Sequence, residues 1–226
     1  MVLDKLDDLW NIDLQDHPIA GVDDCMGKVA LVKTQHLKPD AIHCNAGMYL
    51  IDLSIWREEN WTEQFHHYIK GLFDKHIALG GYEEEVITKV VGERMMVLPP
   101  KYNLMTLEQV FTYKELIRFR QPLRYYTEAQ IEEAKKHPVI THTTNFFYIR
   151  KRIYEENSDH PMRRQYEKYR ALTPWKNDPA MTVTPTFKQK IQKDIWHMMP
   201  KTVAIATGNF VRNEVRPRLE KKRDDE

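Results

Sequence analysis

The stretch HCNAGMYLIDLSIWR, residues 43–57, decides the predicted fold class. It opens with a small polar turn, Asn45-Ala46-Gly47, and continues into the apolar residues 48–53. Those residues lack the polar and apolar alternation of a half-exposed strand, so we expect a strand buried on both faces, as in α/β sheets. Ser54 is the expected N-cap of the next helix, in which apolar residues recur every three or four positions.

Further predicted strands and helices alternate along the chain. This alternation indicates an α/β domain with a mainly parallel sheet. Ligands of such sheets bind beyond the carboxyl ends of the strands, which directs attention to polar residues at those ends. The expected strands are residues 18–22, 95–98 and 138–142, and the expected helices are residues 83–91, 127–136 and the segment from 185 onward.

The composition narrows the class of protein. The chain has 226 residues, of which 42% are hydrophobic, which is enough for a real core in one domain. The formal net charge of +1 gives no indication of a nucleic-acid partner. Cys25 and Cys44 lack a metal-type spacing, and no apolar run is long enough to cross a membrane. These features predict a protein of the reducing cytoplasm.

Polar side chains stand at the ends of the predicted strands, where they are expected to converge on one cleft. Asp23 and Asp24 are either solvated turn acids or carboxylates that bind a polyhydroxyl ligand. Asn45 either holds a tight turn or contacts that ligand, and Gly47 allows close approach of the backbone. His142 is either a structural residue or a ligand of a divalent metal.

Two runs of charged residues can each be interpreted in two ways. Residues 83–85 are three consecutive glutamates, which are either a solvated helix start or site carboxylates. Arg150 begins a run of three basic residues, which are either ordinary surface charge or a clamp on a leaving diphosphate. None of these features is specific alone, but their order along the chain is informative.

Six segments form that order: LDKLDDLWNIDL at 3–14, AGVDD at 20–24, CNAGMYLIDLSIWR at 44–57, LPPKYN at 98–103, PVITH at 138–142 and HPMRRQYEKYRALTPW at 160–175. Together they resemble the family 8 glycosyltransferases, which are retaining enzymes that use a nucleotide sugar and usually manganese. The resemblance covers residues 1–177 and is nearest to bacterial members that build surface polysaccharide or lipopolysaccharide.

The resemblance implies a fold and a function. The fold is the carboxyl-terminal portion of a nucleotide-sugar-binding, GT-A-like Rossmann-type α/β domain. Residues 1–177 would form this partial catalytic domain, and residues 178–226 a helical, basic C-terminal extension. The implied reaction transfers a hexose from a UDP-sugar to a saccharide or lipid-linked saccharide acceptor.

The resemblance also assigns roles to individual residues. Glu83 and Glu84 occupy the positions of the family's catalytic Asp-Gln-Asp element, so a Glu replaces the Gln that the family places near the anomeric carbon. His142 looks like the histidine that ligates Mn²⁺ or Mg²⁺. The residues implied to bind substrate are Asp23, Asp24, Asn45, Ala46, Gly47 and Arg150.

The family's metal-binding Asp-x-Asp precedes the segment that matches residues 3–14, and no such tripeptide occurs in a strand-end setting of this sequence. We therefore expect a missing N-terminal half, a metal that binds only with it, and little activity of the isolated chain. The alternative hypothesis is a catalytically inactive protein that keeps the fold for binding or assembly. Residues 203–223 mix apolar and basic side chains, which suggests either a docked helix or a peripheral contact with the inner membrane face.

Overall fold

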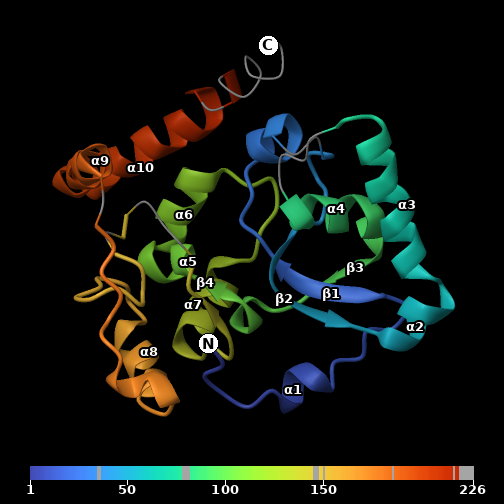
Figure 1. The fold of residues 1–226 in the computed structure, drawn as a ribbon. Helices are drawn as coiled ribbons and strands as arrows, with labels where there is room; N and C mark the ends of the chain where they lie inside the picture. Colours follow the sequence, from blue (N-terminus) through green and yellow to red (C-terminus); the bar gives the residue numbers. More distant parts are fainter. Residues whose placement is uncertain are drawn as a thin grey trace.

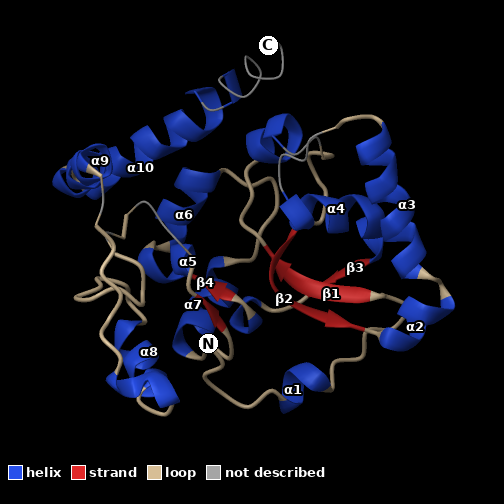
Figure 2. Ribbon diagram, in the orientation of Figure 1, coloured by secondary structure: helices blue, strands red, loops and turns tan. Residues whose placement is uncertain are grey.

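The computed structural model describes residues 1–34, 37–77, 82–144, 148–149, 151–184, 186–215 and 217–218. Two small sheets form its centre and helices surround them (Figures 1 and 2). In the three-stranded sheet, β1 lies between β2, to which it is antiparallel, and β3, to which it is parallel. In the other sheet, β4 and β5 are parallel. The strands are β1 (Ile19–Asp23), β2 (Cys44–Ile51), β3 (Met95–Val97), β4 (Leu104–Met105) and β5 (Thr141–His142).

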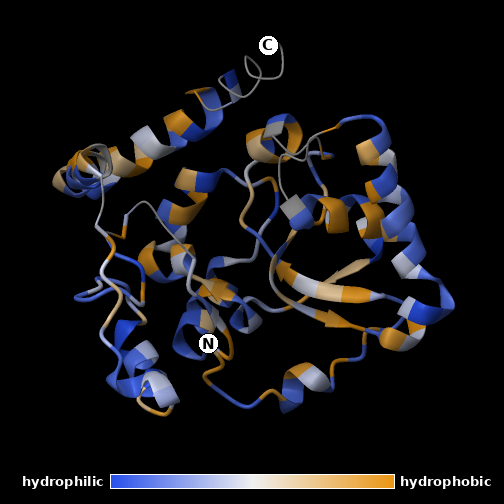
Figure 3. Ribbon diagram, viewed as in Figure 1, coloured by the Kyte–Doolittle hydropathy of each residue, from blue (hydrophilic) through white to orange (hydrophobic). Residues whose placement is uncertain are grey.

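The central strand β1 is buried along all five residues, as expected for a strand with a neighbour on each side. Gly21 is required there, because a Cβ at this position would lie 2.8 Å from the Cβ of Cys44 and 2.9 Å from the ring of Tyr49. Apolar residues dominate β1 and β2, which appear largely orange in Figure 3. The α/β fold class is confirmed, although the predicted mainly parallel sheet is wrong for the β1–β2 pair.

The predicted turn at Asn45-Ala46-Gly47 is also wrong, because these residues are part of strand β2. The pairing of β1 with β2 is irregular: Gly21 is opposite Tyr49, whereas Asp23 is opposite Cys44. The intervening residues of β2 therefore leave the regular ladder, as at a β-bulge, and can turn their polar groups toward other parts of the chain. As an edge strand, β2 is only partly buried beyond its first two residues.

The helix after β2 differs from expectation in its cap and its length. Asp52, and not Ser54, is the N-cap of α2 (Leu53–Glu58): its carboxylate accepts hydrogen bonds from the N–H groups of Ser54 and Ile55 at 2.8 and 3.0 Å. The predicted single helix is instead two helices. They are separated at Asn60, whose left-handed φ of 54° interrupts the helical backbone. The next helix, α3 (Trp61–Asp74), begins there and buries Trp61.

The other predicted helices are confirmed at nearly the expected positions. Helix α7 begins with a capping box in which Thr127 and Gln130 exchange hydrogen bonds. Residues 101–126, which carried no clear periodicity, contain β4 and two short helices. The helices outside β2–α3 are α1 (Asp7–Trp10), α4 (Tyr82–Val91), α5 (Thr106–Val110), α6 (Tyr113–Arg120), α7 (Glu128–Lys136), α8 (Arg163–Arg170), α9 (Phe187–Met198) and α10 (Lys201–Phe210).

Helix α10 packs against the region of α5 and α6, although it is far from these helices in the sequence (Figure 1). Ile205 joins the buried cluster that contains Leu107, Phe111 and Leu116. The Nζ of Lys201 lies 2.7 Å from the Oε2 of Glu115. No helix in the described ranges has both the length and the apolar character needed to cross a bilayer. The boundary at residue 177 between two domains stays a prediction.

Candidate functional site

Asn45 is the centre of a polar network that joins four segments of the chain. Its Oδ1 accepts hydrogen bonds from the N–H of Gly47 at 2.9 Å, from the Nδ2 of Asn103 at 3.0 Å and from the Nδ1 of His142 at 2.9 Å. Its Nδ2 donates to the Oε1 of Glu84 at 2.9 Å. Because Asn45 is buried and all three partners of Oδ1 are donors, the orientation of its amide is fixed.

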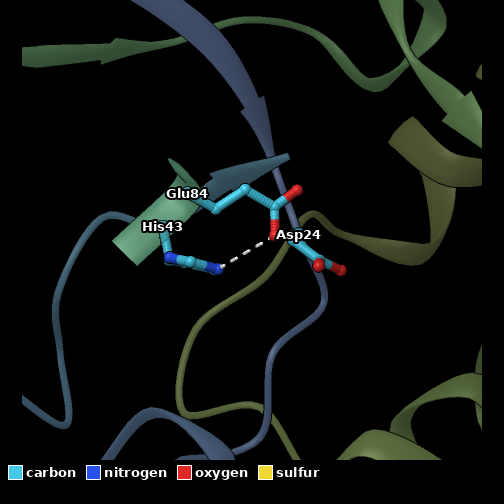
Figure 4. A group of neighbouring side chains, drawn as sticks. All are labelled: Asp24, His43 and Glu84. Atoms are coloured by element: carbon cyan, nitrogen blue, oxygen red, sulfur yellow. Dashed lines mark ion pairs between the residues drawn. The ribbon is translucent and has the colours of Figure 1, made fainter. Parts of the chain in front are cut away.

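Glu84 projects from the first turn of α4 toward the start of β2 (Figure 4). Its Oε1 accepts a second hydrogen bond, from the N–H of Ala46 at 2.9 Å. Burial raises the pKa of Glu84 to about 7, and the negative charge of nearby Asp24 acts in the same direction. This carboxyl group therefore exchanges its proton near neutral pH, which is unusual for a glutamate and typical of functional sites.

His43 and Asp24 lie beside Glu84, as Figure 4 shows. The Nδ1 of His43 is 2.9 Å from the Oγ1 of Thr88, and its Nε2 is 3.9 Å from the Oε2 of Glu84. Burial lowers the pKa of His43, so its imidazole is neutral near pH 7. His43 was not predicted, because one histidine before a strand has no spacing that distinguishes it from a core residue.

Asp23, at the carboxyl end of β1, is held by two residues of the segment that follows α6. The Nη2 of Arg124 lies 2.6 Å from its Oδ2, and its backbone N–H donates to the hydroxyl of Tyr126 at 3.0 Å. Burial raises the pKa of Asp23 to about 6, although the bond to Arg124 opposes this shift. A small pocket beside these groups is lined by Asp23, Asp24, Met26, Leu31, Pro39, Ala41, His43, Leu123 and Arg124.

A glycine is needed at position 47 because His142 packs closely against it, and not because the chain turns there. A Cβ on Gly47 would lie 2.6 Å from the Cε1 of His142 and 2.8 Å from the Oδ1 of Asn45. The absence of a side chain therefore lets the imidazole, at the end of β5, reach Asn45 on β2. Burial lowers the pKa of His142, which keeps this ring neutral as well.

Two predicted residues are not part of this network. Glu83 is exposed on the first turn of α4 and influences Glu84 through its charge. Arg150 lies outside the described residues. Hydrogen bonds join the predicted residues Asn45, Ala46, Gly47, Glu84 and His142. Asp24 lies beside Glu84, and it lines the pocket with Asp23, whereas Asn45 and His142 do not line that pocket.

His142 is presented like a metal ligand, because donation from Nδ1 to Asn45 leaves the lone pair of Nε2 available. Mn²⁺ and Mg²⁺ also require oxygen ligands. Among the described residues, however, His142 belongs to no group of three potential ligands. The described residues therefore do not fit an ion at His142 without carboxylates from another segment.

Comparisons with known proteins identify a family, related proteins and solved structures of similar fold. Residues 1–145 match the model of glycosyl transferase family 8. The chain is 23% identical over 175 residues to General stress protein A of Bacillus subtilis, covering 77% of this chain and 57% of that protein. It is 27% identical over 142 residues to glycosyltransferase GlyA of Streptococcus pneumoniae, covering 63% of this chain and 17% of that protein.

Two solved structures share the fold. The apo structure of the bifunctional glycosyltransferase WbbM has a TM-score of 0.58 at 19% identity, covering 78% of this chain and 32% of that one. The galactosyltransferase LgtC, solved with donor and acceptor sugar analogues, has a TM-score of 0.56 at 13% identity, covering 84% and 61%. The chain thus spans less than two thirds of the proteins that it matches. The family match covers most of its residues: the chain belongs to glycosyl transferase family 8.

Proposed function

We propose that the chain carries the sugar-binding and catalytic side chains of a retaining glycosyltransferase. The enzyme would transfer a hexose from a UDP-sugar to a saccharide or lipid-linked saccharide acceptor, in the synthesis of surface polysaccharide or lipopolysaccharide. The observation that carries this proposal is the carboxyl group of Glu84, which is fixed by Asn45 and Ala46 and has a pKa of about 7. Family membership and the fold shared with LgtC support it.

The network suggests a role for each group. Two N–H donors hold the Oε1 of Glu84, so its Oε2 is directed toward the neighbouring Asp24 and His43. An ionised Glu84 would stabilise the positive charge that develops at the anomeric carbon when the bond to UDP breaks. Asp23 and Asp24 would accept hydrogen bonds from sugar hydroxyl groups, and Asn45 would position Glu84 rather than react. Glu83 remains a secondary candidate, as its side chain is exposed.

The remaining parts of the proposal concern the diphosphate, the metal ion and the cellular compartment. Arg150 is proposed to contact the diphosphate. No step in this mechanism passes through a metal ion, because the described residues do not provide its carboxylate ligands at His142. We place the activity in the cytoplasm, at the inner face of the membrane; the buried, free thiols of Cys25 and Cys44 are consistent with a reducing compartment.

Replacement of the chromosomal codons in the source cells tests this function in the native protein, whatever its length. We expect Glu84→Ala to remove a hexose from a surface glycan, as detected by sugar analysis and by electrophoresis of the purified glycan. Glu93→Ala is the matched control, since Glu93 is exposed on the short helix after α4. A glycan that is unchanged by Glu84→Ala would contradict catalysis and favour a non-catalytic binding protein.

A further inference from the structure

Three potential ligand atoms from Asp24, His43 and Glu84 lie within 4.8 Å of one another (Figure 4). His43 is 1% exposed and Asp24 is 8% exposed, yet the Nε2 of His43 and the Oδ1 of Asp24 have no hydrogen-bond partner among the described residues. Buried polar atoms are rarely left unpaired, because each costs about 1–3 kcal/mol. Asp24 and His43 belong to the same group, and one shared ligand in contact with both atoms would satisfy them.

The hydrogen bonds around His43 define which of its ring nitrogens is a donor. The hydroxyl of Thr88 donates to the backbone carbonyl of Glu84 at 2.8 Å, so its oxygen accepts from the Nδ1–H of His43 at 2.9 Å. In the neutral ring, Nε2 then has a lone pair and no proton. The same arrangement, with a hydrogen bond on one ring nitrogen and a free lone pair on the other, orients histidines that bind metals.

Glu84 is oriented in a similar way. Its Oε1 is occupied by the donors of Asn45 and Ala46, whereas its Oε2 lies 3.9 Å from the Nε2 of His43. That distance is too long for a direct hydrogen bond. Zinc–ligand bonds of about 2.0–2.2 Å place two ligands of one tetrahedral ion roughly 3.4 Å apart, so small side-chain rotations would suffice.

The charges in this region also favour a cation. Arg124 is paired with Asp23, so it does not neutralise Asp24 directly. Arg120 acts on Glu84 through its charge only at longer range, and no ion pair of these two residues is observed in the described part of the chain. Two carboxylates that face one imidazole lone pair are thus left to attract a positive ion.

We propose that Asp24, His43 and Glu84 form a binding site for a divalent transition-metal ion, with Zn²⁺ as the best-matched occupant. One imidazole nitrogen and two carboxylate oxygens suit zinc, which commonly takes three protein ligands and leaves a fourth position open. Asp24 and His43 also line the small pocket beside Asp23, so the proposed site adjoins this pocket. This site is separate from His142 but shares Asp24 and Glu84 with the proposed sugar site, so bound zinc and the donor sugar would exclude each other.

Isothermal titration of the metal-free, purified chain with Zn²⁺ tests the proposal. We expect one high-affinity zinc per chain, and more than about tenfold weaker binding in Asp24→Asn and in His43→Gln. His137→Gln is the matched control: the Nε2 of His137 is also 3.9 Å from a carboxylate oxygen, of Glu133, but the pair is exposed and has no third ligand. The control should bind zinc like the wild type.

A second measurement on the wild type avoids variants that fail to fold. Zinc should shift the ¹⁵N resonance of the Nε2 of His43 and leave its Nδ1 protonated. Absence of stoichiometric binding, an unshifted Nε2, or undiminished affinity in folded His43→Gln would overturn the zinc site. Because no sugar is present, these outcomes leave the proposed transferase function unaffected.

Discussion

At the scale of single residues, Asn45 connects the site. Three donors converge on its Oδ1, and its Nδ2 holds Glu84. A sugar ligand therefore finds the amide oxygen already occupied, and the role that fits the geometry is to position Glu84 and His142. The resemblance implied a direct contact with the sugar, and that role remains a prediction.

The raised pKa of Glu84 makes the stability of the fold depend on pH. Between its ordinary value near 4.5 and about 7, the folded state binds a proton that the unfolded chain has released. Unfolding free energy therefore falls as pH rises through this window, by up to about 1.4 kcal/mol per pH unit for one proton. Glu84→Gln removes this contribution, so the difference in stability between the wild type and the variant should change with pH.

Urea unfolding at a series of pH values from about 4.5 to 8 measures this difference. Asp23 and Glu108 also have raised pKa values, near 6 and 7, and will contribute equally to both proteins. Subtracting the two curves thus isolates Glu84. A difference that does not vary with pH would show that Glu84 titrates as an ordinary glutamate.

At the scale of elements, the close approach of β2 and β5 depends on Gly47. Gly47→Ala places a Cβ against the ring of His142 and should displace it, with the loss of its hydrogen bond to Asn45. We expect a destabilisation of about 1–3 kcal/mol, which is typical of overpacking at a tight site. Thermal unfolding and the imidazole resonances of His142 report the two effects.

Gly71→Ala is the matched control for this substitution. Gly71 lies within α3, and a Cβ there would meet nothing within 4 Å. Alanine in a helix is about 0.5–1 kcal/mol more favourable than glycine, so this variant should be more stable than the wild type. Equal effects of the two substitutions would contradict the close packing of His142 on Gly47.

The elements that the sequence could predict are those with strong local signals. Helix α7 has a capping box and charges that match its dipole, and β1 is a short apolar run that ends in acids. The position of Asn45 could not be predicted, because small polar residues usually indicate a turn and the irregular β1–β2 pairing depends on distant contacts. The cap at Asp52 was missed since Ser54 is an equally good N-cap by type.

At the scale of the whole molecule, the site illustrates what sequence order can and cannot predict. Acids at the end of β1 and a histidine at the end of β5 were expected to converge, because ligands gather at strand ends in α/β folds. His43, Arg124 and Tyr126 joined them only through tertiary contacts between segments up to 103 residues apart. No local pattern marks such residues.

If α10 shares the hydrophobic core of the preceding elements, the C-terminal helices and those elements form one folded unit. Ile205 is 1% exposed and packs with Cys25, Leu107 and Phe111, so Ile205→Ala should destabilise the chain by about 2–5 kcal/mol. Val203→Ala is the control on the same helix, because Val203 is 47% exposed. A single, shifted unfolding transition measured by calorimetry is expected. An unchanged main transition would show that α10 is an independent appendage, as the expected boundary at residue 177 implies.

The central claim is that the network around Asn45 and Glu84 holds the sugar of a UDP-hexose. Saturation-transfer NMR on the purified chain, with UDP-glucose and UDP-galactose in separate samples, tests it most directly. The account predicts transfer to hexose protons of at least one donor, retained in Glu93→Ala and lost in Glu84→Ala. Transfer confined to the uridine protons, or hexose signals that Glu84→Ala leaves unchanged, would contradict it.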